Sequence, residues 1–317
     1  MPCYHPLKGF RSRTVNSSGK RSIVFNESEG FKDLPVQLPC GRCIGCRLER
    51  SRKWAVRCVH EMSLYEDNCF ITLTYSPENY PPDGSLQVKH FQDFMKRLRS
   101  WWTSKQRALS VPRRLRGKIR FFHCGEYGEK FFRPHYHAIL FNFDFPDKEP
   151  FKRSPSGEML FRSSILEKLW GKGFCSIGQA NFETAAYVAR YILKKVSGDA
   201  ADEHYDIVDR RTGEIFLERK PEYVTMSRNP GIGKPWFDKF KSDCFPSDFV
   251  VIGGKKFSIP KFYDDLLGKE DPVTLLRMKA KRKVGQDEHI DWERLGVLED
   301  IQFLRMQKLV RSFEDGS

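Results

Sequence analysis

The chain has 317 residues, of which 39% are hydrophobic and 14% aromatic, so it can bury a substantial core and is not expected to be disordered. It carries 55 Lys and Arg against 41 Asp and Glu, a formal net charge of +14. No apolar run approaches the roughly 18 residues of a membrane span, and the N-terminus lacks the apolar segment of a secretory signal. These features favour the cytoplasm and a partner rich in negative charge.

The positive charge is concentrated in two stretches. Residues 1–60 contain twelve basic and four acidic side chains, and residues 96–120 contain ten basic and no acidic ones. Such clustering favours binding to a phosphate backbone. The Gly-Lys pair at 233–234 does not form a nucleotide-binding loop, because Arg228 and Pro235 stand where that loop needs Gly and Ser or Thr.

Residues 1–117 contain two predicted helices and one predicted strand. Residues 1–39 are expected to be irregular and rich in turns. Apolar residues at helical spacing predict a helix over 47–65, and a β-branched and aromatic run predicts a strand over 69–75. A second helix is expected over 88–102, followed by a basic connector over 103–117.

The centre of the chain reads as two strands joined by a short loop, followed by a helix, a strand and a second helix. The predicted ranges are 118–126, 135–141, 163–170, 173–180 and 182–195. Together with the earlier strand and helix, the order is β, α, β, β, α, β, α. This order predicts an α+β fold with an antiparallel sheet of split βαβ type, similar to ferredoxin and RNA-recognition domains.

The last third of the chain carries weaker signals. The Gly-Gly pair at 253–254 predicts a hairpin, and helices are expected over about 261–283 and 289–312. We therefore divide the chain into an N-terminal Cys-cluster and basic-helix region over 1–66, a core over 67–200 and a helical C-terminal extension of unknown role over 201–317.

A candidate metal site lies in the predicted hairpin. His135 and His137 are two residues apart on a strand, so both imidazoles project from one face. A register that pairs residue 126 with 135 places Glu126 beside His135. Two imidazoles and one carboxylate suit Mg²⁺ or Mn²⁺ acting on a phosphodiester. A register shifted by one residue would move Glu126 to the other face, and its alternative role is a surface carboxylate at the end of the loop. The alternative for His135 and His137 is a pair of structural or surface histidines.

A candidate nucleophile lies in the last predicted helix of the core. Tyr187 and Tyr191 are four residues apart and share a face, which Lys195 continues one turn further on. A tyrosinate can attack a phosphodiester and form a covalent phosphotyrosine, and a nearby cation such as Lys195, or its neighbour Lys194, would assist it. The alternatives are a core tyrosine stripe and a solvated lysine at a helix end.

The N-terminal region holds a candidate zinc site. Cys40, Cys43 and Cys46 supply three thiolates at regular spacing, and a tetrahedral site needs a fourth ligand. Cys3 is the preferred fourth ligand, with His5 and Cys58 as alternatives. The competing interpretation is a set of free thiols in a basic turn.

The motifs resemble, in order, those of HUH endonucleases. The matching segments are TLTY at 72–75, GEYG at 125–128, RPHYH at 133–137 and YVARY at 187–191 with Lys195. The paired tyrosines resemble those of rolling-circle replication initiators of small single-stranded DNA phages. The Cys cluster and the segment LERSRKWAVRCVHE at 48–61 are similar to the gokushovirus branch of the microviruses. The motif resemblance covers about residues 69–196.

The resemblance implies an enzyme that nicks single-stranded origin DNA or viral replicative-form DNA in the host cytoplasm. His135, His137 and Glu126 would be its metal ligands, Tyr187 and Tyr191 its alternating nucleophiles, and Lys195 the lysine of the motif. The enzyme would stay on the 5′ phosphate and leave a 3′ hydroxyl for the host DNA polymerase, working with a host helicase.

Three alternatives are open at this point. A conjugative relaxase is disfavoured because its tyrosines precede the histidines. A non-enzymatic single-stranded DNA-binding protein would use the basic stretches for phosphates and aromatic side chains for base stacking, among them Trp101, Trp102, Phe131 and Phe132. A metal-dependent hydrolase would act without a covalent step.

Overall fold

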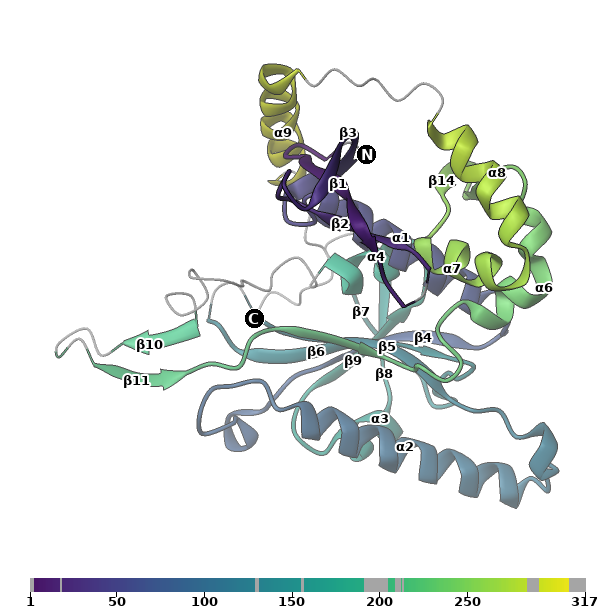
Figure 1. Ribbon diagram of the computed structural model, residues 1–317. Helices are drawn as coiled ribbons and strands as arrows, with labels where there is room; N and C mark the ends of the chain where they lie inside the picture. Colours follow the sequence, from purple (N-terminus) through teal and green to yellow (C-terminus); the bar gives the residue numbers. More distant parts are fainter. Residues whose placement is uncertain are drawn as a thin grey trace. The chain divides into compact units, whose positions relative to one another are not determined.

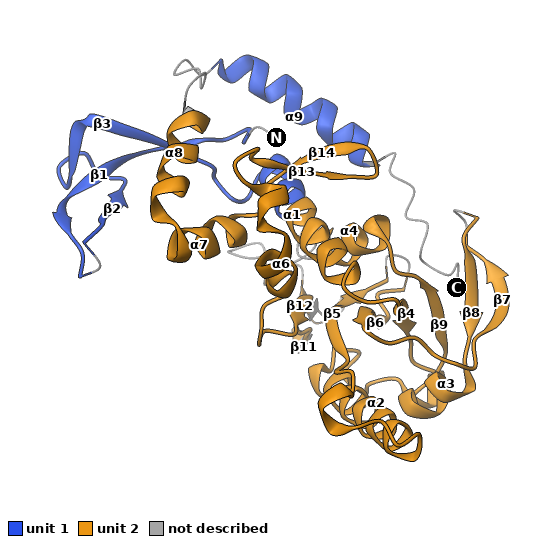
Figure 2. Cartoon of the chain, turned by 90° about the vertical axis from the view of Figure 1, so that its right-hand side faces the viewer, with its two compact units in different colours: residues 1–50, 285–310 blue, residues 51–284, 311–317 orange. Residues whose placement is uncertain are grey.

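The computed structural model describes residues 3–17, 19–128, 131–154, 157–190, 205–208, 212, 214–283 and 291–307. The chain divides into two compact units (Figure 2). One comprises Met1–Arg50 and Gly285–Val310, and the other comprises Ser51–Val284 and Arg311–Ser317. No helix in the described ranges has the length and apolar character needed to cross a membrane. Tyr191 and Lys195 lie outside the described residues.

The first unit contains an antiparallel sheet in a region predicted to be irregular, so that prediction is wrong. The sheet has the order β2-β1-β3, with strands Leu7–Val15, Arg21–Val24 and Gly30–Leu38. Most side chains of β1 are exposed, so its sequence shows little apolar alternation. Pro35 lies where the β1–β3 register shifts, an irregularity that tolerates proline. The helix α9, Trp292–Gln307, also belongs to this unit.

The second unit is built on a seven-stranded antiparallel sheet, and the predicted α+β class with an antiparallel sheet is confirmed (Figure 1). Its strand order is β12-β5-β6-β4-β9-β8-β7. The strands are β4 Asn68–Leu73, β5 Arg120–Tyr127, β6 Pro134–Phe141, β7 Glu149–Arg153, β8 Met159–Arg162, β9 Cys175–Gln179 and β12 Tyr223–Met226.

Helices cover both faces of this sheet. On one face, α2 Val88–Ala108 and α3 Ser164–Trp170 pack against residues that include Ile71 and Tyr136. On the other face, α4 Phe182–Arg190 packs with Ala55 and Cys58, which belong to α1 Ile44–Met62. All eight residues of β6 are buried, so its alternate side chains enter two separate cores. His135 and His137 consequently face α4, whereas Tyr136 faces α2.

The predicted helices are observed with adjusted limits. The helix expected over 88–102 continues to Ala108, because Trp101, Trp102 and Gln106 are at least partly buried on its inner side. Residues 103–108 of the predicted basic connector therefore belong to α2. The helix expected over 261–283 is two helices, α7 Lys261–Glu270 and α8 Pro272–Lys283. The break occurs because proline lacks the N–H that would continue the first helix and favours the start of a new one.

Several elements beyond residue 200 were not predicted, and one of them completes the core sheet. Residues Tyr223–Met226 form β12, which pairs with β5. The pair β10 Asp206–Val208 and β11 Ile215–Glu218 and the helix α6 Lys234–Cys244 are also additional. The hairpin predicted at Gly253-Gly254 is confirmed as β13 Phe249–Ile252 and β14 Lys255–Ser258. Both glycines have positive φ, which a tight hairpin turn requires.

The buried His60 gives the second unit a pH-dependent stability. Its ring stacks on Trp236 with centroids 3.5 Å apart, and its Nδ1 lies 2.9 Å from the Tyr263 hydroxyl. Burial lowers the pKa of His60 from its ordinary value to about 3. Between about pH 6.5 and 3 the unfolded chain binds a proton that the folded chain does not, so stability falls as the pH drops through this range.

We therefore expect acidification from pH 7 to 5 to cost about 2 kcal/mol of unfolding free energy through His60. His60→Phe keeps an aromatic ring against Trp236 but cannot titrate, so its stability should depend less on pH. Urea denaturation of both proteins at pH 7 and 5 measures the difference. An equal pH dependence in the two proteins would contradict a buried neutral imidazole.

Candidate functional site

The hairpin of β5 and β6 brings the predicted metal ligands together. Glu126 is paired with His135, and Cys124 with His137, so the predicted register is confirmed. A Glu126 carboxylate oxygen lies 3.1 Å from His135 Nε2 and 2.8 Å from His137 Nε2. Their potential ligand atoms lie within 4.8 Å of one another. Three donors from two adjacent strands thus converge on one point.

Neighbouring groups orient both imidazoles. The Nδ1 atom of His135 donates to the backbone carbonyl of Arg133 at 3.1 Å, which leaves its Nε2 as the atom available for a metal. The Nδ1 atom of His137 lies 3.0 Å from the Thr72 hydroxyl, and Thr72 stands opposite His137 on β4. Both Nε2 atoms therefore point at Glu126. Sequence reasoning gave Thr72 no role. Its role in orienting His137 depends on the pairing of β4 with β6, which the sequence does not reveal.

Glu126 is fully buried and yet ionised. Burial alone would raise its pKa, but the adjacent His135 and His137 imidazoles outweigh burial and lower the pKa to about 2. A buried carboxylate beside two imidazole Nε2 atoms is a donor set that fits a divalent cation such as Mg²⁺ or Mn²⁺.

The Tyr187 ring lies beside this cluster. Its centroid is 5.1 Å from that of His137, with the two rings nearly perpendicular. The Arg190 guanidinium carbon lies 5.6 Å from the Tyr187 ring centroid. Tyr187 is buried against Phe70 in the core on the α4 face. Sequence reasoning did not select Arg190, although its position one helical turn after Tyr187 was a usable signal.

The four aromatic residues considered for base stacking fall into two groups. Trp101 and Trp102 are partly buried and pack on Phe143, with ring centroids 6.3 and 5.2 Å away. They pack against the core, which takes up part of the ring surface that could otherwise stack on bases. Phe131 and Phe132, in the loop between β5 and β6, expose 67% and 47% of their surface.

The N-terminal cysteines form a second cluster. Cys3, Cys40, Cys43 and Cys46 place their sulfur atoms within 4.8 Å of one another. Gly41 has a φ of +73°, a left-handed conformation that glycine adopts readily and that turns the chain between Cys40 and Cys43. His5 contacts Glu299, and Cys58 lies in a core of the second unit, so the preferred fourth member, Cys3, is the one that joins the cluster.

Backbone groups stabilise negative charge on these sulfur atoms. The Cys43 N–H donates to Cys40 Sγ at 3.3 Å, and the Cys40 N–H donates to Cys3 Sγ at 3.2 Å. Burial opposes ionisation of the Cys40 thiol, but the N–H groups of Cys43 and Arg42 help to lower its pKa to about 7. Four converging sulfur atoms fit the tetrahedral donor set of structural zinc.

We expect the purified chain to bind about one Zn²⁺ per molecule and Cys43→Ser to lower this content to near zero, because structural zinc needs all four ligands. Cys175→Ser is the matched control, since Cys175 is buried in the second unit away from the cluster. Metal analysis after gel filtration measures the ratio. A wild-type chain that stays free of zinc after incubation with Zn²⁺ would establish free thiols.

Comparison with known proteins agrees with the motif resemblance. The family model for replication-associated protein ORF2/G2P matches residues 68–196. The chain is 32% identical over 292 residues to replication-associated protein VP4 of Bdellovibrio phage phiMH2K, covering 91% of this chain and 84% of that protein. The chain belongs to the family of microvirus replication-associated proteins.

Other microvirus replication-associated proteins are also similar. The chain is 34% identical over 257 residues to replication-associated protein ORF2 of Spiroplasma virus 4, covering 78% of this chain and 73% of that protein. It is 28% identical over 242 residues to replication-associated protein ORF4 of Chlamydia phage 1, covering 75% of this chain and 55% of that protein. No match to a solved structure was found. The family match contains Glu126, both histidines and Tyr187.

Proposed function

We propose that this microvirus replication-associated protein is an HUH endonuclease that initiates rolling-circle replication by nicking single-stranded or supercoiled origin DNA. The observation that carries the proposal is the position of the Tyr187 ring, 5.1 Å from the His137 ring on the face that also presents Glu126 and His135. The order β4, α2, β5, β6, α3, β9, α4, with the hairpin of β7 and β8 inserted before α3, supports the split βαβ arrangement of this class.

In the proposed reaction the Tyr187 hydroxyl oxygen attacks the phosphorus of the scissile phosphodiester. The new bond joins the tyrosine to the 5′ phosphate, and the bond to the 3′ oxygen breaks. The phenol loses its proton in this step, and the departing oxygen takes up a proton and becomes the 3′ hydroxyl from which the host polymerase extends. Because the covalent phosphotyrosine keeps the bond energy, attack by a 3′ hydroxyl reverses the step and rejoins the strand without a nucleotide cofactor.

Different residues would bind the metal, position the imidazole rings and supply positive charge near the phosphate. Glu126, His135 and His137 would hold Mg²⁺ or Mn²⁺, which when bound supplies a Lewis acid for the phosphate oxygens. Thr72 and the Arg133 carbonyl fix the two imidazole rings. Arg190 brings positive charge to the Tyr187 ring, where it favours the approach of a phosphate.

The roles of two further residues, Tyr191 and Lys195, come from the motif resemblance. Tyr191 would act as the alternate nucleophile, cleaving the regenerated origin while Tyr187 holds the displaced 5′ end. Lys195 would assist the phenols as a cation. The host helicase and DNA polymerase would supply strand separation and synthesis in the bacterial cytoplasm.

The test is an adduct assay. The protein is incubated with Mn²⁺ and an end-labelled origin strand from the phage genome, and the products are separated on a denaturing gel. The proposal predicts a DNA fragment covalently attached to protein. Cleavage without an adduct would instead identify a hydrolase, and gel retardation without cleavage would identify a non-enzymatic DNA-binding protein.

A further inference from the structure

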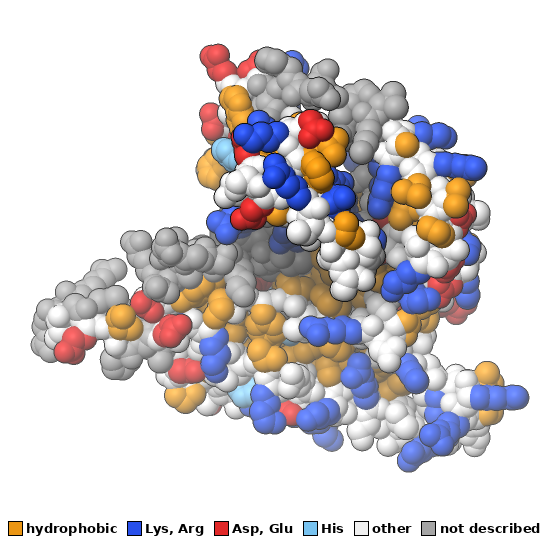
Figure 3. Space-filling model, viewed as in Figure 1, with side chains coloured by type: hydrophobic (Ala, Val, Ile, Leu, Met, Phe, Trp, Pro, Cys, Tyr) orange, Lys and Arg blue, Asp and Glu red, His pale blue; other side chains and the backbone are white. Residues whose placement is uncertain are grey.

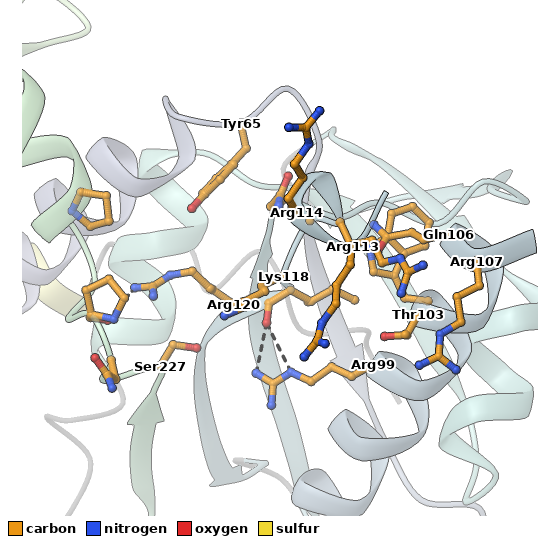
Figure 4. A pocket seen from close by; sticks show the side chains of 18 residues that line it. Tyr65, Arg99, Thr103, Gln106, Arg107, Arg113, Arg114, Lys118, Arg120 and Ser227 are labelled. Atoms are coloured by element: carbon orange, nitrogen blue, oxygen red, sulfur yellow. Dashed lines mark hydrogen bonds between the residues drawn. The ribbon is translucent and has the colours of Figure 1, made fainter. Parts of the chain in front are cut away.

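A large basic pocket lies at the end of β5 that is remote from Glu126. Its volume is about 1380 Å³, and six arginines and one lysine are among the residues that line it. They come from the end of α2, the connector after it and the first residue of β5. Figure 3 shows Lys and Arg side chains gathered over the end of α2, and Figure 4 shows Arg99, Arg113 and Lys118 beside one another in the pocket.

Most of this positive charge is available to a ligand. The described residues that line the pocket include no Asp or Glu. Arg120 is bound to the buried carboxylate of Glu61 at 2.6 Å and belongs to the core. No other cation of the pocket has a carboxylate partner within the described part of the chain, and Arg107, Arg113, Arg114 and Lys118 are exposed.

Two of the guanidinium groups are held in place. Arg99 donates two hydrogen bonds to the Ile119 carbonyl at 3.1 and 3.3 Å (Figure 4). Arg116 donates to the Val111 carbonyl at 3.0 Å. A carbonyl partner positions a guanidinium without neutralising it, so the pocket wall keeps its charge. Fixed cations without acidic neighbours suit a polyanion with regularly spaced charges.

Charge dominates the lining of the pocket. Six arginines and one lysine line it, against two aromatic side chains, Tyr65 and Trp102, both of which are partly buried. Trp102 also packs edge-to-face on Phe143, with ring centroids 5.2 Å apart. The phosphate backbone is therefore the ligand that this lining favours.

The pocket has a defined position relative to the candidate active site. Arg120, which lines the pocket, and Glu126 are six residues apart on β5, so the pocket end of this strand is about 20 Å from Glu126 at roughly 3.4 Å per residue. In B-form DNA this distance corresponds to about six base pairs. A DNA flank of this length can therefore extend from the candidate active site to the pocket end of β5.

On the basis of the proposed function, we propose that this pocket binds the DNA phosphate backbone about six base pairs from the scissile phosphate. The binding would hold the origin flank while the active site engages the nick. It would be independent of base sequence, because the contacts are to phosphates.

The binding test compares Arg113→Ala/Arg114→Ala/Arg116→Ala with Lys255→Ala/Lys256→Ala/Lys261→Ala, a control that removes the same charge from exposed residues of β14 and α7. Fluorescence anisotropy measures affinity for a labelled mixed-sequence 25-base-pair duplex, and separately for its single strand, over a range of salt. Loss of three phosphate contacts should reduce the salt slope by about 2.7 for duplex or 2.1 for single strand, and weaken binding roughly 100-fold at 0.1 M salt. The form of DNA whose salt slope falls in the alanine variant is the form that occupies the pocket.

A charge-conserving variant separates electrostatics from folding. Arg113→Lys/Arg114→Lys/Arg116→Lys should retain the wild-type slope, whereas a structural role of Arg116 would impair both pocket variants. The proposal would be overturned if the alanine variant kept the wild-type salt slope of DNA binding. It would also be overturned if the control variant lost as much of that slope as the alanine variant.

Substrate length gives a second readout. Wild-type protein should form its adduct faster on origin DNA that extends about 12 base pairs on the pocket side of the nick than on DNA that extends about 3, and the alanine variant should lose this advantage. A wild-type protein that forms no adduct would refute the nickase while leaving the salt slopes to decide the pocket. If the wild-type protein forms the adduct, but the alanine variant keeps the wild-type salt slopes and flank length has no effect on adduct formation, only the proposed role of the pocket would be refuted.

Discussion

His137→Ala is expected to reduce Mn²⁺-dependent cleavage of origin DNA by at least about 1000-fold, since a Lewis-acid metal contributes several kcal/mol and each 1.4 kcal/mol is tenfold in rate. His137 is almost fully buried, and its Nε2 lies 2.8 Å from Glu126. Alanine removes one of three protein donors and leaves the carboxylate beside a single imidazole. Such a site binds a divalent ion more weakly and no longer fixes its position.

The measurement has two parts. Mn²⁺ binding is followed by electron paramagnetic resonance, and cleavage is followed on the denaturing gel at saturating DNA. Both should fall together in His137→Ala and in the wild-type protein treated with EDTA. His5→Ala is the matched control, because His5 is exposed in the first unit and contacts Glu299.

A purely structural cluster would give a different pattern. If Glu126 and the histidines only bonded to one another, His137→Ala would lower the unfolding temperature while EDTA left cleavage intact. Undiminished cleavage in EDTA would therefore contradict the metal site, whatever the stability of the variant.

The hairpin that carries the candidate metal site could be predicted because two periodicities determine it. Side chains alternate along a strand, and antiparallel pairing fixes which residues lie opposite one another, so His135, His137 and Glu126 followed from one assumed register. Because β6 is buried on both faces, burial of apolar side chains does not select the register, which therefore had to be assumed. The same reasoning predicted the hairpin at Gly253-Gly254, where the turn needs positive φ.

The elements that escaped prediction depend on distant pairing. The strand β12 has four residues and forms because β5 offers a free edge, which no local pattern around Tyr223 reveals. The strands β1–β3 carry mostly exposed polar side chains, so their alternation is faint. The basic pocket likewise joins residues near Arg113 to Ser227 and Pro230, which only the folded chain brings together.

The double variant Tyr187→Phe/Tyr191→Phe is expected to lose the covalent DNA adduct altogether, a fall of at least about 1000-fold, because the phenol oxygen is the atom that forms the bond. Phenylalanine keeps the ring of Tyr187 against Phe70 and His137, so folding and DNA binding should persist. Tyr223→Phe is the matched control, since it removes a buried phenol that packs in the α2 core. The adduct is measured by transfer of label from origin DNA to protein.

The single variants separate one nucleophile from two. If both tyrosines alternate, Tyr187→Phe and Tyr191→Phe should each retain part of the first nicking step but fail to complete a second cleavage on a substrate carrying two origins. If Tyr187 alone attacks, Tyr187→Phe should match the double variant, and Tyr191→Phe should release closed circles at the wild-type rate. An adduct that survives in the double variant would contradict both schemes and assign the bond to another side chain. The contrast is informative because closure after one round requires a nucleophile that is not already holding the 5′ end.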